Sequence, residues 1–278
     1  MGTLVGDADC TSELFCLKGR TAVITGGAGM LAQEFAKALL DAGAAVVLAD
    51  VDASRCKERV AALLGDRNDA EQLAMSMELD VSRKDKWEEV AAWVLNSFGH
   101  IDILVNNAAI TNATRSEGYS ADFLEFGADD WNQVIGVNLT GAFLGCQVVG
   151  KHMVARGKGT IINIASIYGV TSPNHRIYEG TGVVQPVAYS VSKAGVIALT
   201  RYLGTLWAEK GVRVNSLTPG GVFDNQSDSF VSRYGRLSPM GRMADRREMR
   251  GALLYLSSDA SSYCTGHNLV VDGGWTSW

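Results

Sequence analysis

The stretch TAVITGGAGMLA, residues 21–32, places a short apolar run directly before a glycine cluster and the start of a helical pattern. Glycine lets the backbone turn tightly where a strand gives way to a helix. The cluster has the spacing GxxGxxA, formed by Gly26, Gly29 and Ala32, so small residues stand where backbone and helix approach closely. The stretch therefore predicts a first strand, a tight turn and a helix, the opening unit of an α/β protein.

Similar apolar, β-branched runs alternate with helical patterns along most of the chain. We expect strands at 21–25, 45–50, 73–80, 101–106, 159–166, 212–219 and 267–274, and helices at 30–43, 53–64, 83–98, 129–156, 188–210 and 245–257. This alternation predicts a doubly wound parallel sheet of about seven strands with helices on both faces. Ligands of such sheets bind at the carboxyl ends of the strands.

Composition limits the function classes. The chain has 278 residues, a formal charge of −5 and no stripe of basic residues, so neither nucleic acid nor an anionic membrane is an expected partner. No linker divides the sequence, so we expect a single domain over residues 1–278, with 1–18 as a leader. A small polar molecule is the expected partner.

Targeting and redox signals are weak. No run of about 18 uncharged apolar residues occurs, and residues 1–20 lack the plan of a signal peptide. The five cysteines form no CxxC pair, and the histidines are scattered, so we expect neither a disulfide framework nor a metal site. A cytoplasmic location is the expectation.

The glycine turn points to a cofactor. N–H groups at a helix start attract anions, and glycines let a pyrophosphate come close to the backbone. A glycine cluster between a first strand and a helix therefore predicts a dinucleotide site. We expect Gly26, Gly29, Met30 and Leu31 to contact the dinucleotide.

Further cofactor contacts are expected at the ends of later strands. Asp50 closes the second strand, where a carboxylate can accept hydrogen bonds from both adenosine ribose hydroxyls. A 2′-phosphate would meet like charge there, so NAD is favoured over NADP, although Arg55 lies nearby in the sequence. At the third and fourth strand ends, the residues expected to contact the cofactor are Asp80, Val81, Asn107 and Ala108.

The segment YSVSK places Tyr189 four residues before Lys193 on one face of a predicted helix. Two interpretations compete. The tyrosine could lie at the core edge with the lysine extending past it to water. Alternatively, the ammonium stabilises a phenolate, so that Tyr189 transfers protons near neutral pH.

Taken together, these motifs resemble the short-chain dehydrogenase/reductase family over residues 18–276. The matching segments are TGGAGMLA, Asp50, LDVS, NNAA, VNLTGAF, INIAS, YSVSK, RVNSLTPGG and TGHNLVVDGG. The resemblance implies a Rossmann-type fold, nicotinamide-dependent hydride transfer and a homotetramer or homodimer. We expect subunit contacts through 129–156, 188–210 and the C-terminal Trp275 and Trp278.

The resemblance also implies roles for individual residues. Tyr189 would be the general acid/base, and Lys193 would lower its pKa and hold the nicotinamide ribose. Ser166 would polarise the substrate oxygen, although it could also be a helix or turn cap, and Asn138 would position a water in a proton relay. Pro219, Gly220 and the backbone of Val222 would line the nicotinamide.

Two segments beside these residues are candidates for the substrate pocket. Residues 167–187 are longer than the common family spacing, and we expect Tyr168, His175, Arg176 and Tyr178 there to contact a sugar, sugar acid or sugar phosphate. A solvated loop or a subunit contact is the alternative. Residues 224–244 are polar, and we expect them to form a lid that stays open until ligand arrives.

Three functions remain open. The first is an NAD-dependent oxidoreductase acting on a secondary alcohol or ketone of a sugar-like compound. The finer resemblance is to flagellin-modification and gluconate-type oxidoreductases. The second is a nucleotide-sugar epimerase or dehydratase, suggested by the GxxGxxA spacing, although the chain ends soon after the last strand. The third is a catalytically silent NAD-binding protein.

Overall fold

The structure is a computed structural model that describes residues 11–65, 74–111, 119 and 121–278. Within it, seven strands form one parallel sheet in the order β3-β2-β1-β4-β5-β6-β7. The strands are β1 Thr21–Thr25, β2 Ala45–Asp50, β3 Ala74–Glu78, β4 Ile103–Asn106, β5 Gly159–Ile164, β6 Val212–Pro219 and β7 Asn268–Val271. The predicted doubly wound α/β fold is confirmed.

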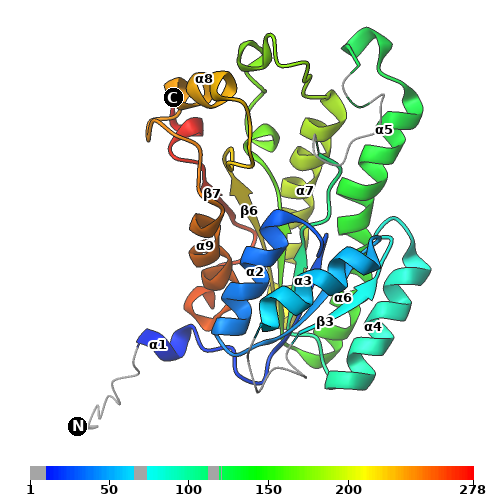
Figure 1. Cartoon of the computed structure of the whole chain (residues 1–278). Helices are drawn as coiled ribbons and strands as arrows, with labels where there is room; N and C mark the ends of the chain where they lie inside the picture. Colours follow the sequence, from blue (N-terminus) through cyan, green and yellow to red (C-terminus); the bar gives the residue numbers. More distant parts are fainter. Residues whose placement is uncertain (1–10, 66–73, 112–118, 120) are drawn as a thin grey trace.

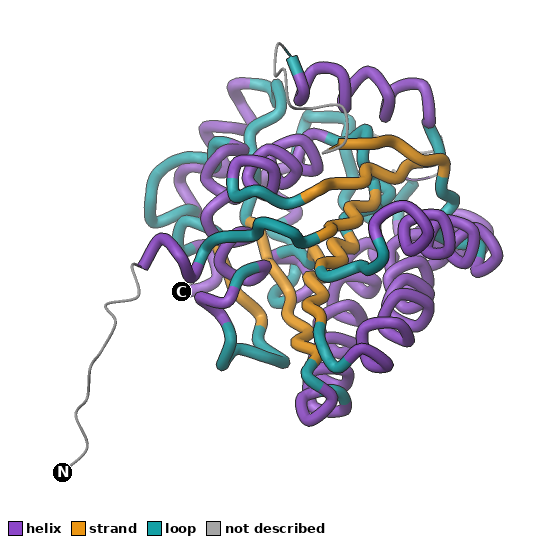
Figure 2. The backbone as a smooth tube through the Cα atoms, turned by 90° about the horizontal axis from the view of Figure 1, so that it is seen from below, coloured by secondary structure: helices purple, strands orange, loops and turns teal. Residues whose placement is uncertain are grey.

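Helices lie on both faces of this sheet (Figure 1, Figure 2). Their bounds are α1 Thr11–Leu14, α2 Met30–Asp41, α3 Ala53–Leu64, α4 Lys84–Phe98, α5 Ala128–Ile135, α6 Gly141–Arg156, α7 Val187–Leu206, α8 Asp228–Leu237 and α9 Met249–Ser257. The expected boundaries hold to within a few residues, except that 129–156 is α5 and α6 joined by a π-helical turn. Residue 73, the start of the third predicted strand, lies outside the described residues.

The core has two layers because successive strand residues point to opposite faces. On one face Ile24 and Leu48 pack with apolar residues of α2, α3 and α9. On the other, Val23 and Val47 pack with residues of α4, α6 and α7. Both faces of the strands are therefore buried, as parallel sheets require.

The strand order reverses between β1 and β4, and ligand sites of open α/β sheets lie at such a switch point. Here Thr25 Oγ1 accepts hydrogen bonds from the backbone N–H groups of Asn107 and Ala108, each at 3.0 Å. The Asn107 side chain also donates to the carbonyl oxygen of Thr25 at 2.9 Å. These bonds hold the ends of β1 and β4 together beside the glycine turn.

The helical run Ala128–Arg156 is long and apolar enough, by length and composition, to cross a membrane. Its most apolar window is 56% buried within the protein, however, and residues of α6 pack against α4 and the sheet. This burial is what a core helix shows.

Candidate functional site

The glycine turn is built for close backbone approach. Gly26 has φ +65°, and a Cβ there would lie 2.8 Å from the Cα of Ala108. Gly29 is the N-cap of α2 and has no side chain to cap the first turn, which leaves the N–H groups around Met30 and Leu31 open to an anion. The turn therefore fits the pyrophosphate of a dinucleotide.

Asp50 lies beside this turn at the end of β2. One carboxylate oxygen accepts from the backbone N–H of Ala28 at 3.0 Å and the other from that of Asp52 at 3.0 Å. Arg55 is exposed in the first turn of α3. A fixed carboxylate at this strand end suits hydrogen bonding to a ribose diol.

The next two residues predicted to contact the cofactor, Asp80 and Val81, make contacts within their own loop and with α6. Asp80 accepts hydrogen bonds from the backbone N–H and the hydroxyl of Ser82, at 2.9 and 2.6 Å. Val81 is buried against Gly141, where an added Cβ would lie 2.7 Å from it. These contacts fix the loop between β3 and α4 at the same edge of the sheet.

Tyr189 and Lys193 lie in the first turns of α7, beside the end of β5. Lys193 is buried, its Nζ donates to the carbonyl oxygen of Ile164 at 2.7 Å, and it lies 5.7 Å from the centroid of the Tyr189 ring. The Ser166 side chain lies close enough to half-buried Tyr189 to lower the pKa of its hydroxyl. The structure thus brings three of the four predicted catalytic side chains together, Ser166, Tyr189 and Lys193.

The electrostatics differ from the expectation. Burial raises the pKa of Tyr189, an effect that the nearby Ser166 side chain opposes, and burial lowers the pKa of Lys193 to about 8. Burial is the largest effect on the Tyr189 pKa, and the effect that opposes it comes from Ser166 and not from Lys193. Ser166 also caps a 3₁₀ turn by accepting from the N–H of Tyr168 at 3.2 Å, which is the alternative interpretation given for this residue.

Asn138 lies in the π-helical turn Gly136–Thr140 between α5 and α6. It is buried, its Oδ1 accepts from the N–H of Ile110 at 2.7 Å, and its Nδ2 donates to the Ser192 hydroxyl at 3.3 Å. That hydroxyl in turn donates to the carbonyl oxygen of Tyr189 at 2.7 Å. Asn138 is therefore linked to α7 through Ser192, a residue that the sequence analysis did not identify.

The loop after β6 is held on two sides. Gly220 donates to Val271 of β7 at 2.9 Å, and Val222 forms a parallel bridge with Ala244. Pro219 ends β6 at the same sheet edge. The loop expected to line the nicotinamide is thus fixed between β7 and the segment before α9.

The insertion 167–187 and the segment 224–244 pack on each other. The hydroxyl groups of Tyr168 and Tyr178 lie 2.8 Å apart in an apolar cluster that also contains Tyr189 and Phe230 of α8. His175 and Arg176, the other two predicted substrate residues, lie in the same insertion in a 3₁₀ helix and are exposed. Tyr168 and Tyr178 therefore lie in the same cluster as Tyr189, whereas His175 and Arg176 lie on the outer surface.

The expected open lid contains a packed helix. Residues 228–237 form α8 because its apolar face, with Phe230, Val231 and Tyr234, lies in the cluster around Tyr189. The sequence analysis took the polar residues between these positions as a sign of an open segment. The sequence analysis did not identify Tyr234. It expected Trp275 to lie in a subunit contact, but Trp275 is buried within its own chain, where its ring stacks on that of Tyr234. The helical spacing of Phe230, Val231 and Tyr234 is the signal that could have identified α8.

In the part of the chain that the structure describes, no three His, Cys, Asp or Glu side chains gather where they could hold a metal ion. The polar groups at the carboxyl edge come from six strands: Thr25 and Asp50 end β1 and β2, and Asp80, Asn107, Ser166 and the backbone of Gly221 follow β3, β4, β5 and β6. This arrangement places the glycine turn, the Asp50 carboxylate and the Ser166–Tyr189 pair along one edge of the sheet.

Comparison with known proteins adds to this geometry. Residues 27–276 match the family model described as enoyl-(acyl carrier protein) reductase. The chain is 33% identical to a D-threitol dehydrogenase of Mycolicibacterium smegmatis, covering 94% of this chain and 95% of that protein. It is also 33% identical to a 2-dehydro-3-deoxy-D-gluconate 5-dehydrogenase of Bacillus subtilis, covering 95% and 98%.

A solved structure is similar over the whole chain. The gluconate 5-dehydrogenase of Burkholderia cenocepacia, in complex with NADP and tartrate, superposes with a TM-score of 0.83 at 32% identity, covering 97% of this chain and 100% of that one. Similarity in sequence and structure therefore extends across both the glycine turn and the Tyr189 region.

Proposed function

Because the chain belongs to the short-chain dehydrogenase/reductase family, whose members are nicotinamide-dependent oxidoreductases, we propose that it transfers hydride between NAD and a polyol or sugar-acid substrate. The reacting group would be a secondary alcohol or the corresponding ketone. The observation that carries the proposal is the contact of Tyr189 with Ser166 and Lys193 at the sheet edge that holds the glycine turn.

Each residue has a separate task in this reaction. The nicotinamide, when bound, supplies or accepts the hydride. Tyr189 would take the hydroxyl proton during oxidation and return it during reduction. Ser166 would donate a hydrogen bond to the substrate oxygen, where negative charge develops.

Two buried groups would support Tyr189. Lys193, fixed by Ile164, would place its positive charge near the phenolate and donate to the nicotinamide ribose. Asn138 would hold α7 through Ser192 and position a water that returns protons to Lys193. Neither residue is exposed, so their geometry is set by the protein.

The cofactor preference rests on Asp50. Its carboxylate stands at the adenosine end of the expected site, where the 2′-phosphate of NADP would meet like charge. The Burkholderia relative has NADP bound, so family membership alone does not select NAD. The position of Asp50 beside the glycine turn favours NAD for this chain.

The substrate class rests on the relatives and on the two wall tyrosines. D-threitol and 2-dehydro-3-deoxy-D-gluconate, named for two relatives, each carry several hydroxyl groups. Tyr168 and Tyr178 place two hydroxyl groups in the cluster that contains Tyr189. A polyol would exchange its hydrogen bonds to water for bonds to these hydroxyls. Arg176, on the outer surface, would reach only a longer anionic substrate.

The test is a panel of threitol, glycerol, gluconate and 2-dehydro-3-deoxy-D-gluconate with NAD or NADP, followed by absorbance of the reduced coenzyme. We expect accumulation of NADH with at least one polyol or sugar acid and weaker use of NADP. Turnover only with apolar secondary alcohols would contradict the substrate class. Epimerisation of a nucleotide sugar without net NADH, or NADH binding without any turnover, would favour the two alternative functions.

We also propose a cytoplasmic homotetramer or homodimer that uses the outer faces of α5, α6 and α7. Phe143 on α6 and Tyr202 and Leu206 on α7 expose apolar surface, at 44, 66 and 51% of their area. Burying such surface in a subunit contact would be favourable. Light scattering of the purified chain measures the assembly directly, and a monomer at micromolar concentration would contradict this proposal.

A further inference from the structure

Tyr234 connects α8 to the loop after β6. It is 2% exposed, and its hydroxyl oxygen accepts a hydrogen bond of 2.6 Å from the backbone N–H of Gly221. A Cβ at Gly221 would lie 2.6 Å from the Tyr234 ring, so only glycine permits this approach. The contact therefore requires both residues as they stand.

The same helix touches the insertion on its other side. The rings of Phe230 and Tyr178 lie with centroids 5.3 Å apart, and Arg233 donates to the carbonyl oxygens of Glu179 and, at 3.5 Å, Ile177. Residues of α8 therefore contact the proposed substrate wall directly. Through Tyr234 the helix also contacts the loop proposed to line the nicotinamide.

The C-terminal turn supports α8 from behind. Figure 1 shows the chain end beside α8, and the contacts agree: Trp275 stacks on Tyr234 at 4.3 Å with an interplanar angle of 21°, and Trp278 Nε1 donates to the carbonyl oxygen of Leu237 at 3.1 Å. Asp272 fixes this turn by accepting from the N–H of Gly274 and from Thr276. The Tyr234 ring is thus held independently of its hydroxyl.

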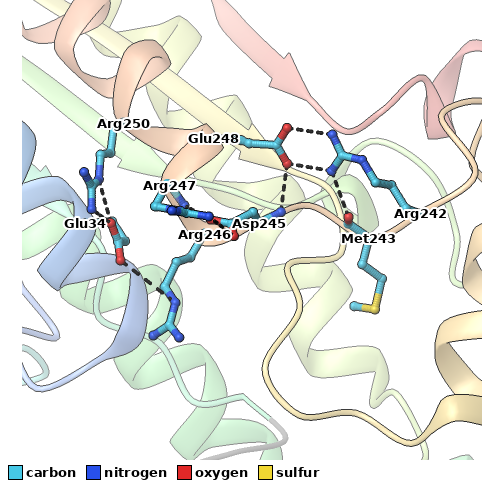
Figure 3. Close-up of polar contacts among 8 residues, drawn as sticks. All are labelled: Glu34, Arg242, Met243, Asp245, Arg246, Arg247, Glu248 and Arg250. Carbon is cyan, nitrogen blue, oxygen red and sulfur yellow. Dashed lines mark hydrogen bonds and ion pairs between the residues drawn. The ribbon is translucent and has the colours of Figure 1, made fainter.

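The segment after α8 returns to the same loop. Ala244 exchanges backbone hydrogen bonds of 2.9 Å with Gly221 and Phe223. Two ion pairs lie in the segment that follows (Figure 3). Arg242 donates two hydrogen bonds of 2.7 Å to Glu248, and Arg250 donates to Glu34 of α2. With its flanks held in this way, the N–H of Gly221 has a single side-chain partner, Tyr234, among the contacts of the described residues.

We propose that Tyr234 is a positioning residue: its hydroxyl fixes the Gly220–Val222 backbone and so couples the substrate-side contacts of α8 to nicotinamide binding. This inference rests on the proposed function. Burial and the nearby Asp272 carboxylate raise the pKa of Tyr234, so its hydroxyl acts as a neutral hydrogen-bonding group. Loss of that group would loosen the loop without unfolding the helix, since Trp275 still holds the ring.

The test compares Tyr234→Phe with Tyr255→Phe, a control on α9 whose side chain is partly buried against the core. NADH binding is measured by fluorescence titration, alone and with a product ketone, alongside steady-state kinetics. We expect Tyr234→Phe to raise the Kd of NADH about 3- to 10-fold, which corresponds to one lost hydrogen bond. The control should stay within twofold of the unaltered protein.

A second pair of variants tests the same contact from the glycine side, in case Tyr234→Phe fails to fold. Gly221→Ala would displace the Tyr234 ring, whereas Gly251→Ala on α9 adds a methyl group with no neighbour within 4 Å. We expect Gly221→Ala to raise the Kd of NADH. We also expect a product ketone to increase the NADH affinity of this variant less than it increases that of the unaltered protein. In Gly251→Ala both quantities should be unchanged. NADH affinities within twofold of normal for both Tyr234→Phe and Gly221→Ala would overturn the inference alone. Absence of NADH binding by the unaltered protein would overturn the proposed function as well.

Discussion

Lys193 donates a hydrogen bond of 2.7 Å from Nζ to the carbonyl oxygen of Ile164, the last residue of β5. This bond joins the proposed proton-transfer helix α7 to the sheet. The ammonium is buried, and burial lowers its pKa to about 8. The group that would stabilise the Tyr189 phenolate is therefore kept at a cost in stability.

Lys193→Met should separate stability from activity. At pH 7 the buried Lys193 ammonium lowers the free energy of unfolding by about 3 kcal/mol, because its pKa falls from 10.5 to about 8 and each pKa unit corresponds to 1.36 kcal/mol. Between pH 8 and 10.5 the unfolded lysine keeps a proton that the folded one has lost, so the stability of the unaltered protein rises with pH there. We expect the stability of the variant, relative to the unaltered protein, to fall as pH rises through this window, with activity strongly reduced.

Urea unfolding at pH 7, 8.5 and 10 measures this difference. Lys210→Met, at a residue exposed in the short turn after α7, is the matched control and should show no such trend. A constant difference between Lys193→Met and the unaltered protein at all three pH values would contradict the pKa assignment.

Ser166→Ala should move the pH profile of alcohol oxidation. The Ser166 hydroxyl lowers the Tyr189 pKa against the effect of burial, so removing it raises that pKa further. Oxidation requires the deprotonated tyrosine, and the rising limb of kcat/KM should shift upward by roughly one pH unit, in addition to a lower maximum. A downward shift would show that Ser166 does not stabilise the phenolate.

Asp50→Asn should relax the coenzyme preference. The amide retains an acceptor for the ribose but loses the charge that opposes a 2′-phosphate. We expect KM for NAD to rise and KM for NADP to fall, changing the ratio of the two kcat/KM values by roughly 10- to 100-fold. Asp52→Asn is the control, since Asp52 caps α3 next to Asp50 and is exposed. An unchanged ratio in Asp50→Asn would mean that another residue reads the ribose.

Tyr178→Phe should weaken substrate binding without affecting the coenzyme. The change removes a hydroxyl 2.8 Å from that of Tyr168 but keeps the ring contact with Phe230. We expect a 3- to 10-fold higher KM for the polyol substrate, the range of one hydrogen bond, and an unchanged Kd of NADH. Tyr202→Phe, on the exposed face of α7, is the control. An unchanged KM for every polyol would remove Tyr178 from the pocket.

The sheet could be predicted well from the sequence because its five inner strands are largely buried on both faces and read as mostly apolar runs. β1, β2 and β6 have the predicted bounds. The residues that surround Tyr189 could be predicted less well. Whether His175 and Arg176 lie in the pocket depends on how the insertion folds onto α8, and no local pattern encodes that contact.

The electrostatics of the site also could not be predicted from spacing. The YxxxK pattern places Lys193 one turn from Tyr189, but the pKa of each group depends on how completely the fold removes it from water. The contact between α8 and Gly221 also could not be predicted, because Tyr234 and Gly221 are 13 residues apart and meet only in the folded chain.

Tyr189→Phe tests the central claim most directly. The change removes only the hydroxyl, and the Lys193 bond to Ile164 remains. Measured with NAD and the best substrate of the panel, kcat should fall by about 10²- to 10⁴-fold while the Kd of NADH stays within a few fold of normal. A variant that keeps more than a tenth of the normal kcat, at any pH from 6 to 10, would show that Tyr189 does not transfer the proton.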